Sequence, residues 1–196
     1  MSIVAVPGGK LAAVVTYLEM TTRPEIAIPA SPLRLEPIAP SPAAYRILFA
    51  RIGAPWLWFS RLVMPEAELA AILGDERVRL FEVREGESVA GMLELDAREQ
   101  GACELAFVGL IPELAGRGHG RWLLAEAISR AWAIDGVERV HVHTCTLDHP
   151  AALGAYRRAG FAAVARKVET FIDPRVAGVF PRDTAPQVPL VERPSN

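Results

Sequence analysis

The feature that most constrains the fold is a central segment in which a strand pattern leads through a glycine-rich loop into a helix pattern, ELAFVGLIPELAGRGHG. Cys103–Leu110 has the composition of a strand, and Gly118–Ile134 carries its apolar residues on one helical face. The loop between them contains Gly116, Gly118 and Gly120. Glycines let a backbone approach a ligand closely, and the free amides of a helix start suit a pyrophosphate. Because the spacing matches neither the dinucleotide fingerprint nor a P-loop, the loop alone indicates either a phosphate site or a turn without a ligand.

The periodicity of the rest of the chain predicts an α/β (α+β) protein with a central mixed sheet and helices on both faces. Further strands are expected at Arg77–Arg84, Ser88–Asp96, Glu138–Thr146 and Phe161–Phe171. Further helices are expected at Pro42–Gly53, Pro65–Leu73 and Pro150–Ala159. Ser41 is a suitable N-cap for the first of these helices, since Pro42 follows it at the first helical position.

The two ends of the chain are expected to differ from this regular middle. Residues 1–171 are predicted to form a single domain that begins with a hairpin turning at Pro7–Lys10, because Gly-Gly separates two apolar stretches. Prolines cluster at 24–42 and again at 174–194, so we expect a loop over 24–40. Residues 172–196 are predicted to be a proline-rich tail that cannot supply a central strand.

Composition excludes several classes of protein. The chain has 196 residues, 51% of them apolar, and a net charge of −2, which disfavours both disorder and nucleic-acid binding. It lacks an apolar run long enough to cross a membrane and a signal-peptide pattern at its start. The two cysteines, Cys103 and Cys145, make no disulfide framework. A cytoplasmic protein without membrane or nucleic-acid partners is therefore expected.

Two motifs resemble those of the GNAT superfamily of acyl-CoA N-acyltransferases. The first is the family's Gln/Arg-x-x-Gly-x-Gly/Ala loop, which corresponds here to residues 115–120 with Ala115 in place of the usual Gln or Arg. The second is DHPAALGAYRRAGF at residues 148–161, in which Ala152, Tyr156, Gly160 and Phe161 match and His149 replaces the usual Asn. The resemblance covers residues 43–171 and implies a mostly antiparallel sheet. Sheets of the family usually finish with one more paired strand after the position of Phe161–Phe171, and the proline-rich end of this chain departs from that pattern.

The resemblance implies acetyl-CoA as the acyl donor and no metal. The residues expected to bind it are Leu110, Ile111, Gly116, Arg117, Gly118, His119, Gly120, Arg121 and His149. In the family, loop amides hold the pyrophosphate, and a backbone N–H near Leu110 would polarise the thioester carbonyl, where a fixed donor stabilises an oxyanion.

Two residues are expected to carry the chemistry. An alkylammonium, with a pKa of about 10.4, must lose a proton before it attacks a thioester. Glu104 resembles the family's catalytic glutamate in its spacing to the glycines, and Tyr156 resembles its tyrosine acid, which protonates the departing thiolate. Alternatives stay open: Glu104 could be a surface strand carboxylate, Tyr156 a packing residue, and a histidine or water the base.

The acceptor side is less determined by the sequence. An aromatic segment contains Trp56, Trp58 and Arg61, which could wall a pocket and hold an acceptor carboxylate, or could anchor the loop to the core. His143 could line the same side. Because His141, His143 and Cys145 alternate along one strand, a small metal-site protein is an alternative.

The function predicted from the sequence is transfer of an acetyl group from acetyl-CoA to an amine that the sequence does not identify. A non-catalytic acyl-CoA-binding module that uses the same loop is the main alternative. An exposed sheet edge would favour a homodimer.

Overall fold

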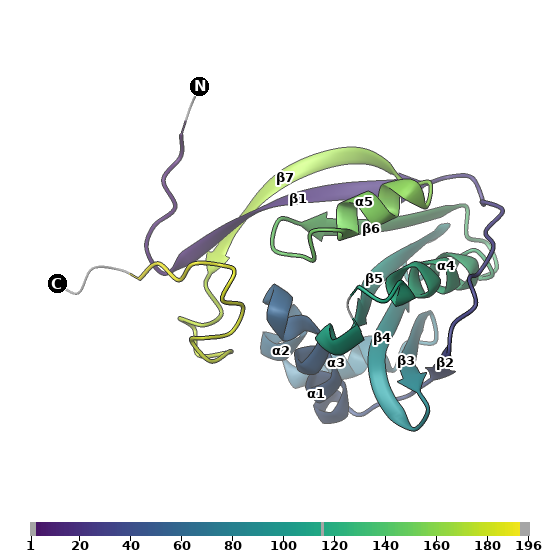
Figure 1. The fold of residues 1–196 in the computed structure, drawn as a ribbon, viewed down its shortest axis with the longest axis horizontal. Helices are drawn as coiled ribbons and strands as arrows, with labels where there is room; N and C mark the ends of the chain where they lie inside the picture. The colour runs from purple at the N-terminus through teal and green to yellow at the C-terminus, as the bar shows by residue number, and fades with distance from the viewer. Residues whose placement is uncertain (1–2, 115, 193–196) are drawn as a thin grey trace.

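The computed structural model describes residues 3–114 and 116–192 and contains one seven-stranded sheet in the order β2-β3-β4-β5-β6-β1-β7 (Figure 1). The strands are β1 (Lys10–Met20), β2 (Leu33–Pro37), β3 (Val78–Glu85), β4 (Ser88–Asp96), β5 (Ala102–Leu110), β6 (Arg139–Cys145) and β7 (Ala162–Ile172). Only β5 and β6 are parallel neighbours, and every other pair is antiparallel. The predicted mixed, mostly antiparallel sheet is therefore confirmed.

Helices pack on both faces of the sheet and create two cores. On one face, α4 (His119–Ala131) and α5 (Ala152–Arg158) contribute to a core that includes Leu93, Leu105 and Val142. On the other face, α1 (Pro42–Gly53) and α3 (Glu66–Leu73) cover Leu80 and Met92. Alternate residues of β4 serve opposite cores, as the two-residue period of a strand requires.

The expected N-terminal hairpin is wrong. Residues 3–7 form no strand, and β1 lies between β6 and β7 inside the sheet. Leu18 of β1 is opposite Val142 of β6, and Val14 is opposite Val168 of β7. The β-branched residues of β1 favour a strand, but the pairing partners lie at least 120 residues away along the chain. The strand that pairs with β7 is thus the N-terminal β1, and residues 173–192 form no strand.

The segment predicted as a loop contains a short strand as well. In β2, Leu33 and Leu35 alternate with charged residues and pair with Glu85 and Val83 of β3. Four residues between Pro32 and Pro37 give a weak strand signal, and the pairing partner decides the conformation.

The proline-rich tail folds back onto the end of β1 and the aromatic segment around α2 (Ser60–Val63) (Figure 1). Arg175 is buried, pairs with Asp173 at 2.7 Å and donates to the carbonyls of Thr184 and Val188. Phe180 and Ala185 pack with Leu57, Leu11 and Phe59. A buried ion pair and a small apolar cluster therefore order a segment that has no helix or strand.

The other predicted elements are present with small shifts at their ends. Ser41 accepts a hydrogen bond from the Ala44 amide at the start of α1, as expected of an N-cap. The aromatic segment contains a 3-10 turn at Ala54–Trp56 and the one-turn helix α2 (Ser60–Val63). In the described part of the chain, no helix combines the length and apolar character that crossing a bilayer requires.

If β1 is a core strand, Leu18→Ala should lower the free energy of unfolding by about 2–5 kcal/mol, because it leaves a cavity in a fully buried site. Ile3→Ala is the matched control, since Ile3 is 89% exposed and should change stability by less than about 0.5 kcal/mol. Urea unfolding of both variants measures the difference. Equal effects would contradict the placement of β1.

Candidate active site

A split between β5 and β6 is the central feature of the site. The two strands pair only over Ala102–Glu104 and Arg139–His141, and then they diverge (Figure 1). β5 continues to Leu110 and β6 to Cys145 without pairing with each other. Beyond these pairs the two backbone edges are not bonded to each other and can contact a ligand, although the Cys145 amide of β6 donates to Asp148.

The direction of the β5 amides identifies which of them face the split. The Ile111 amide donates to the Ala90 carbonyl of β4 at 2.9 Å, so it already has a hydrogen-bond partner within the sheet. Because successive amides along a strand point to opposite edges, the Leu110 amide points toward the split. Of the two residues expected to contact the donor by backbone, Leu110 has the free amide and Ile111 does not.

A bulge changes the register of β5 inside the split. Leu95 of β4 is opposite Leu105, but Glu94 is opposite Phe107, so Ala106 is an extra residue. Bulges bend a strand and redirect its side chains. Here the bulge lies next to Glu104 and lets Leu105 face the α4 core while Phe107 faces α1.

The glycine loop joins the open end of the split to α4. After the 3-10 turn Pro112–Leu114, Gly116 and Gly118 have φ of 76° and 81°, a conformation that side chains disfavour. No side chain caps the start of α4. The loop glycines and Arg117 and Arg121 are exposed. Ala115 lies outside the described residues. The helix start thus presents free amides and two guanidinium groups to solvent.

Glu104 and His143 meet at the closed end of the split. Glu104 Oε1 lies 3.0 Å from His143 Nδ1. The hydrogen bond to His143 holds the pKa of Glu104 below its usual range, although burial acts in the opposite direction. The same bond raises the pKa of His143. The Tyr17 ring of β1 lies 5.8 Å from the His143 ring. The imidazole is half exposed, so one ring edge faces solvent.

Tyr156 lies on α5, on the other face of the sheet, and its ring packs edge-on against Phe161 at 5.9 Å. Burial and the charge of Asp148 raise the pKa of its hydroxyl. The hydroxyl therefore stays protonated at neutral pH and can donate a hydrogen bond. Because a thiol has a pKa of about 8.5, full proton transfer from this tyrosine to a thiolate would be uphill.

Sequence comparison identifies the family of this chain. A model of the acetyltransferase (GNAT) family matches residues 46–161, more than half of the chain. The chain belongs to this family. A comparison with curated proteins found no match.

Solved structures share the GNAT fold. A GCN5-related N-acetyltransferase from Sphaerobacter thermophilus has a TM-score of 0.59 and 19% identity, over 81% of this chain and 51% of that one. A GCN5-related N-acetyltransferase from Kribbella flavida has a TM-score of 0.51 and 18% identity, over 87% and 63%. An acetyltransferase from Thermus thermophilus has a TM-score of 0.51 and 22% identity, over 71% and 96%. This chain thus spans about half the length of the first of these proteins.

In this GNAT chain, Trp58 occupies a slot between α1 and β5 that two glycines create. A Cβ on Gly53 would lie 2.4 Å from the Trp58 Cβ, and a Cβ on Gly109 would lie 3.2 Å from its ring. The indole also packs against Phe49 and Phe107. Trp58 is therefore an anchor of the aromatic segment, as the core alternative proposed.

Asp148 connects the aromatic segment to the loop after β6. One carboxylate oxygen accepts from the Trp58 indole N–H at 3.0 Å. The other accepts from the Thr144 hydroxyl at 2.7 Å and the Cys145 amide at 2.8 Å. Trp56 adds an edge contact to His149, with ring centroids 5.1 Å apart. These contacts bridge the two sides of the split. Sequence reasoning did not single out Asp148, although it opens the second family motif.

Arg61 forms an ion pair inside the protein. Its Nη2 donates to Glu94 Oε1 at 2.6 Å, and the Tyr45 hydroxyl donates to the other oxygen of the same fully buried carboxylate. The guanidinium also lies over Phe107. Although burial disfavours its charge, Glu94 holds the pKa of Arg61 above normal. The expected contact of Arg61 with an acceptor carboxylate is therefore corrected, and Tyr45 and Glu94 were missed.

The structure offers little support for the metal alternative. His141 lies 3.7 Å from Glu99, and His143 is bonded to Glu104. Over residues 3–114 and 116–192, no three His, Cys, Asp or Glu side chains are arranged around a common metal position.

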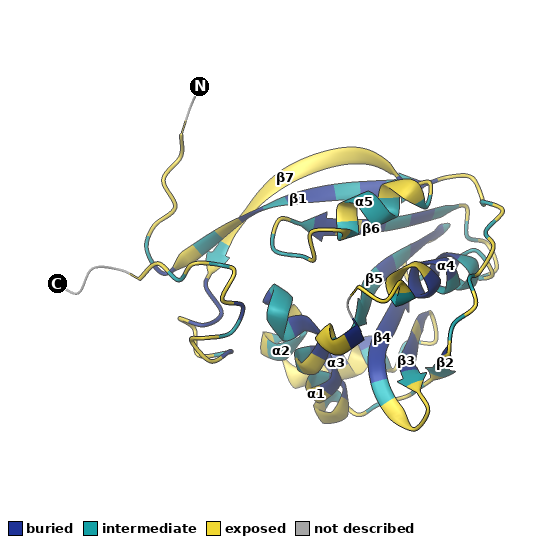
Figure 2. Ribbon diagram, viewed as in Figure 1, coloured by how far each residue is buried: buried dark blue, intermediate teal, exposed yellow. Residues whose placement is uncertain are grey.

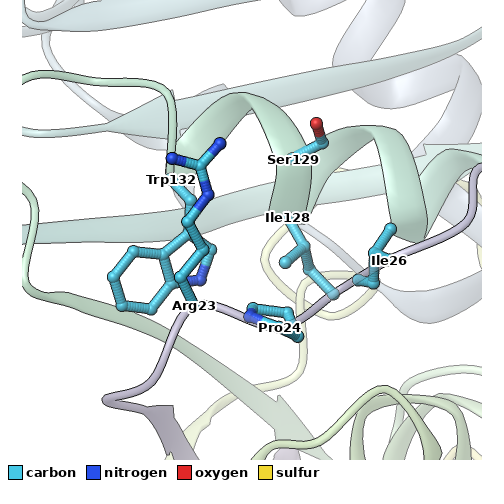
Figure 3. Close-up of a pocket in the computed structure, with 6 residues that line it drawn as sticks. All are labelled: Arg23, Pro24, Ile26, Ile128, Ser129 and Trp132. Carbon is cyan, nitrogen blue, oxygen red and sulfur yellow. The ribbon is translucent and has the colours of Figure 1, made fainter.

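Two surface clefts lie away from the split. A cleft of about 120 Å³ lies between Arg23–Ile26 and the second half of α4, next to Trp132 (Figure 3). A larger one, of about 670 Å³, lies near Gly101 and Gly136, beyond the paired end of β5 and β6. Neither is lined by Glu104 or the glycine loop.

Removing Arg61 should destabilise the fold. Arg61→Ala leaves Glu94 buried without its cation, so we expect the free energy of unfolding to fall by about 3–5 kcal/mol. Arg61→Met/Glu94→Gln should recover at least half of this loss, because no charge is then buried. Arg98→Ala is the control, since its exposed pair with Asp96 should contribute less than about 1 kcal/mol. A chemical denaturation series in which Arg61→Ala behaves like Arg98→Ala would refute the structural role.

Proposed function

We propose that this GNAT protein transfers an acetyl group from acetyl-CoA to an amine. The observation that carries the proposal is the Glu104–His143 pair at the closed end of the split, with the glycine loop at its open end. Family membership supports an acyltransferase, and the arrangement supplies a base and an anion site along one channel. Turnover measured as release of free thiol, with a panel of amines, tests the activity.

The residues around the split fit a coenzyme A thioester. The unpaired amides at the start of α4, with Arg117 and Arg121, would bind the pyrophosphate. The Leu110 amide, which points into the split, would donate to the thioester carbonyl. His119 lies within the glycine loop motif and His149 within the second motif, and we propose that they line the same donor site.

The Glu104–His143 pair would accept the proton of the attacking amine. When His143 is neutral, its Nδ1–H donates to Glu104, and the lone pair on Nε2 can accept a proton. As the new N–C bond forms, the Leu110 amide stabilises the oxygen that gains charge. The C–S bond then breaks, and the thiolate leaves with a hydrogen bond from Tyr156 before solvent protonates it. Glu104 orients His143 in this scheme, and direct proton transfer to Glu104 is its alternative.

The acceptor would enter beside the aromatic segment, where Trp56 is half-buried and Trp58 is fixed by Asp148. Aromatic walls favour an acceptor with an apolar or aromatic body. Because Arg61 is paired with Glu94, recognition of an acceptor carboxylate is no longer part of the proposal.

The proposal predicts a pH dependence with a defined sign. The raised pKa of His143 means that its pair with Glu104 stabilises the fold fully below about pH 6.5 and less as pH rises through that pKa. Below the raised pKa, His143 is protonated and cannot act as a base. The rate constant kcat/KM should therefore rise with pH through a midpoint above about 6.5.

Two variants separate the roles in this pair. Glu104→Gln should lower kcat about 10²–10⁴-fold and move the midpoint to lower pH, because His143 loses the carboxylate that raises its pKa. His143→Gln should remove the midpoint. If the pH profiles of kcat/KM had the same midpoint in the wild type, Glu104→Gln and His143→Gln, they would contradict the assignment. Coenzyme A binding without thiol release from any amine would instead favour a non-catalytic acyl-CoA-binding module.

Coenzyme A binding should depend on the glycine loop. Gly118→Val should raise the Kd for coenzyme A at least tenfold, because φ of 81° is strained for valine and the side chain would stand beside the helix amides. Gly86→Val is the matched control, since Gly86 also has positive φ and open space but lies in the β3–β4 turn. Calorimetry that shows equal affinity for both variants would reject the loop as the binding site.

A further inference from the structure

The outer strand β7 is a long free sheet edge. It pairs with β1 on one side and, among the described residues, with no strand on the other. All of its residues except Phe171 are exposed (Figure 2), with Val168 at 68%. Free edges of this kind are templates for another strand, and proteins usually shorten or cover them.

The opposite edge of the sheet, formed by β2, is better protected against an added strand. There β2 has only five residues and ends at Pro37, a residue that cannot donate a ladder hydrogen bond. β7 has 11 residues and no proline. An added strand is therefore expected at β7 and not at β2.

The sequence of β7 is complementary to itself. In an antiparallel pair about a two-fold axis at Val168, Lys167 of one copy is opposite Glu169 of the other, and the same contact recurs across the axis. Arg166 is opposite Thr170, and Val168 is opposite itself. Opposite residues differ by an even number of positions, so both side chains lie on the same sheet face.

Neighbouring registers are worse. An axis at Arg166, Lys167 or Glu169 would place a charged residue opposite its own copy, and like charges directly opposite are destabilising. With the axis at Val168, the two valines form a central apolar pair, and on each side of them Lys167 of one copy lies opposite Glu169 of the other. Among the axes from Arg166 to Glu169, the charge order Arg-Lys-Val-Glu therefore favours the one at Val168.

We propose that a second copy of this chain pairs with β7 in this register, so that two sheets become one continuous sheet. The paired segment is residues 165–171, which avoids the register shift of β7 near Tyr17 and Leu18. Two strands, β6 and β1, lie between β7 and the split, which therefore stays open in the dimer. The proposal therefore does not depend on the enzymatic activity.

A charge swap tests the register. Each single variant, Lys167→Glu or Glu169→Lys, places like charges opposite each other at two positions of the dimer. Each should therefore raise the dissociation constant Kd of the dimer roughly tenfold or more in sedimentation equilibrium. Lys167→Glu/Glu169→Lys should restore the wild-type Kd. Arg51→Glu, which reverses an exposed charge on α1, should leave it unchanged. A monomeric wild type, or a double variant that is not rescued, would overturn the proposal.

A second measurement avoids the contact of Lys167 with the Tyr17 ring, which the swap also removes. Val168→Cys places a thiol opposite its own copy, within the Cα spacing that a disulfide spans. Mild oxidation should convert this variant into a covalent dimer, whereas wild type, with Cys103 buried and Cys145 half-buried, should stay unlinked. A Val168→Cys protein that does not cross-link would contradict the axis at Val168.

Discussion

The short contact between β5 and β6 is the constraint on which the rest of the structure depends. These strands are parallel neighbours, and they hydrogen-bond over three residue pairs before they diverge. A longer ladder would use the Leu110 amide within the sheet and close the split. The bulge at Ala106 accompanies the separation and turns Phe107 toward α1. Free backbone edges in the middle of a sheet are costly unless something satisfies them, and a thioester ligand would do so.

Three sets of contacts hold the two halves of the sheet at this separation. At the closed end, Glu104 of β5 is bonded to His143 of β6. On the α1 face, Trp58 packs on β5 and donates to Asp148 in the loop after β6. The Glu94 carboxylate, bonded to Arg61 and Tyr45, fixes the segment that carries Trp58. The Arg61–Glu94 charges near the split therefore have a structural role, whereas His143 of the Glu104–His143 pair stays half exposed.

Local sequence predicted most elements because their signals are local. The ends of α1 follow from Ser41, Pro42 and Gly53, and β4 was predicted with its observed bounds. The glycine loop could also be predicted from the sequence, because the positive φ at Gly116 and Gly118 favours glycine. Long-range pairing was not readable. The strand β2 and the position of β1 were missed, since a strand's partner is set by contacts far along the chain.

The same division holds for the site. The sequence by itself determined that a strand, a glycine loop and a helix stand in series, and that Glu104 precedes them at a fixed spacing. Only the tertiary structure decided that His143 lies beside Glu104, because the parallel register of β5 and β6 brings them together. It also assigned Arg61 to Glu94 instead of to an acceptor. The charge of a side chain follows from the sequence alone. Its interaction partner depends on which strands are neighbours and on which face of the sheet each residue lies.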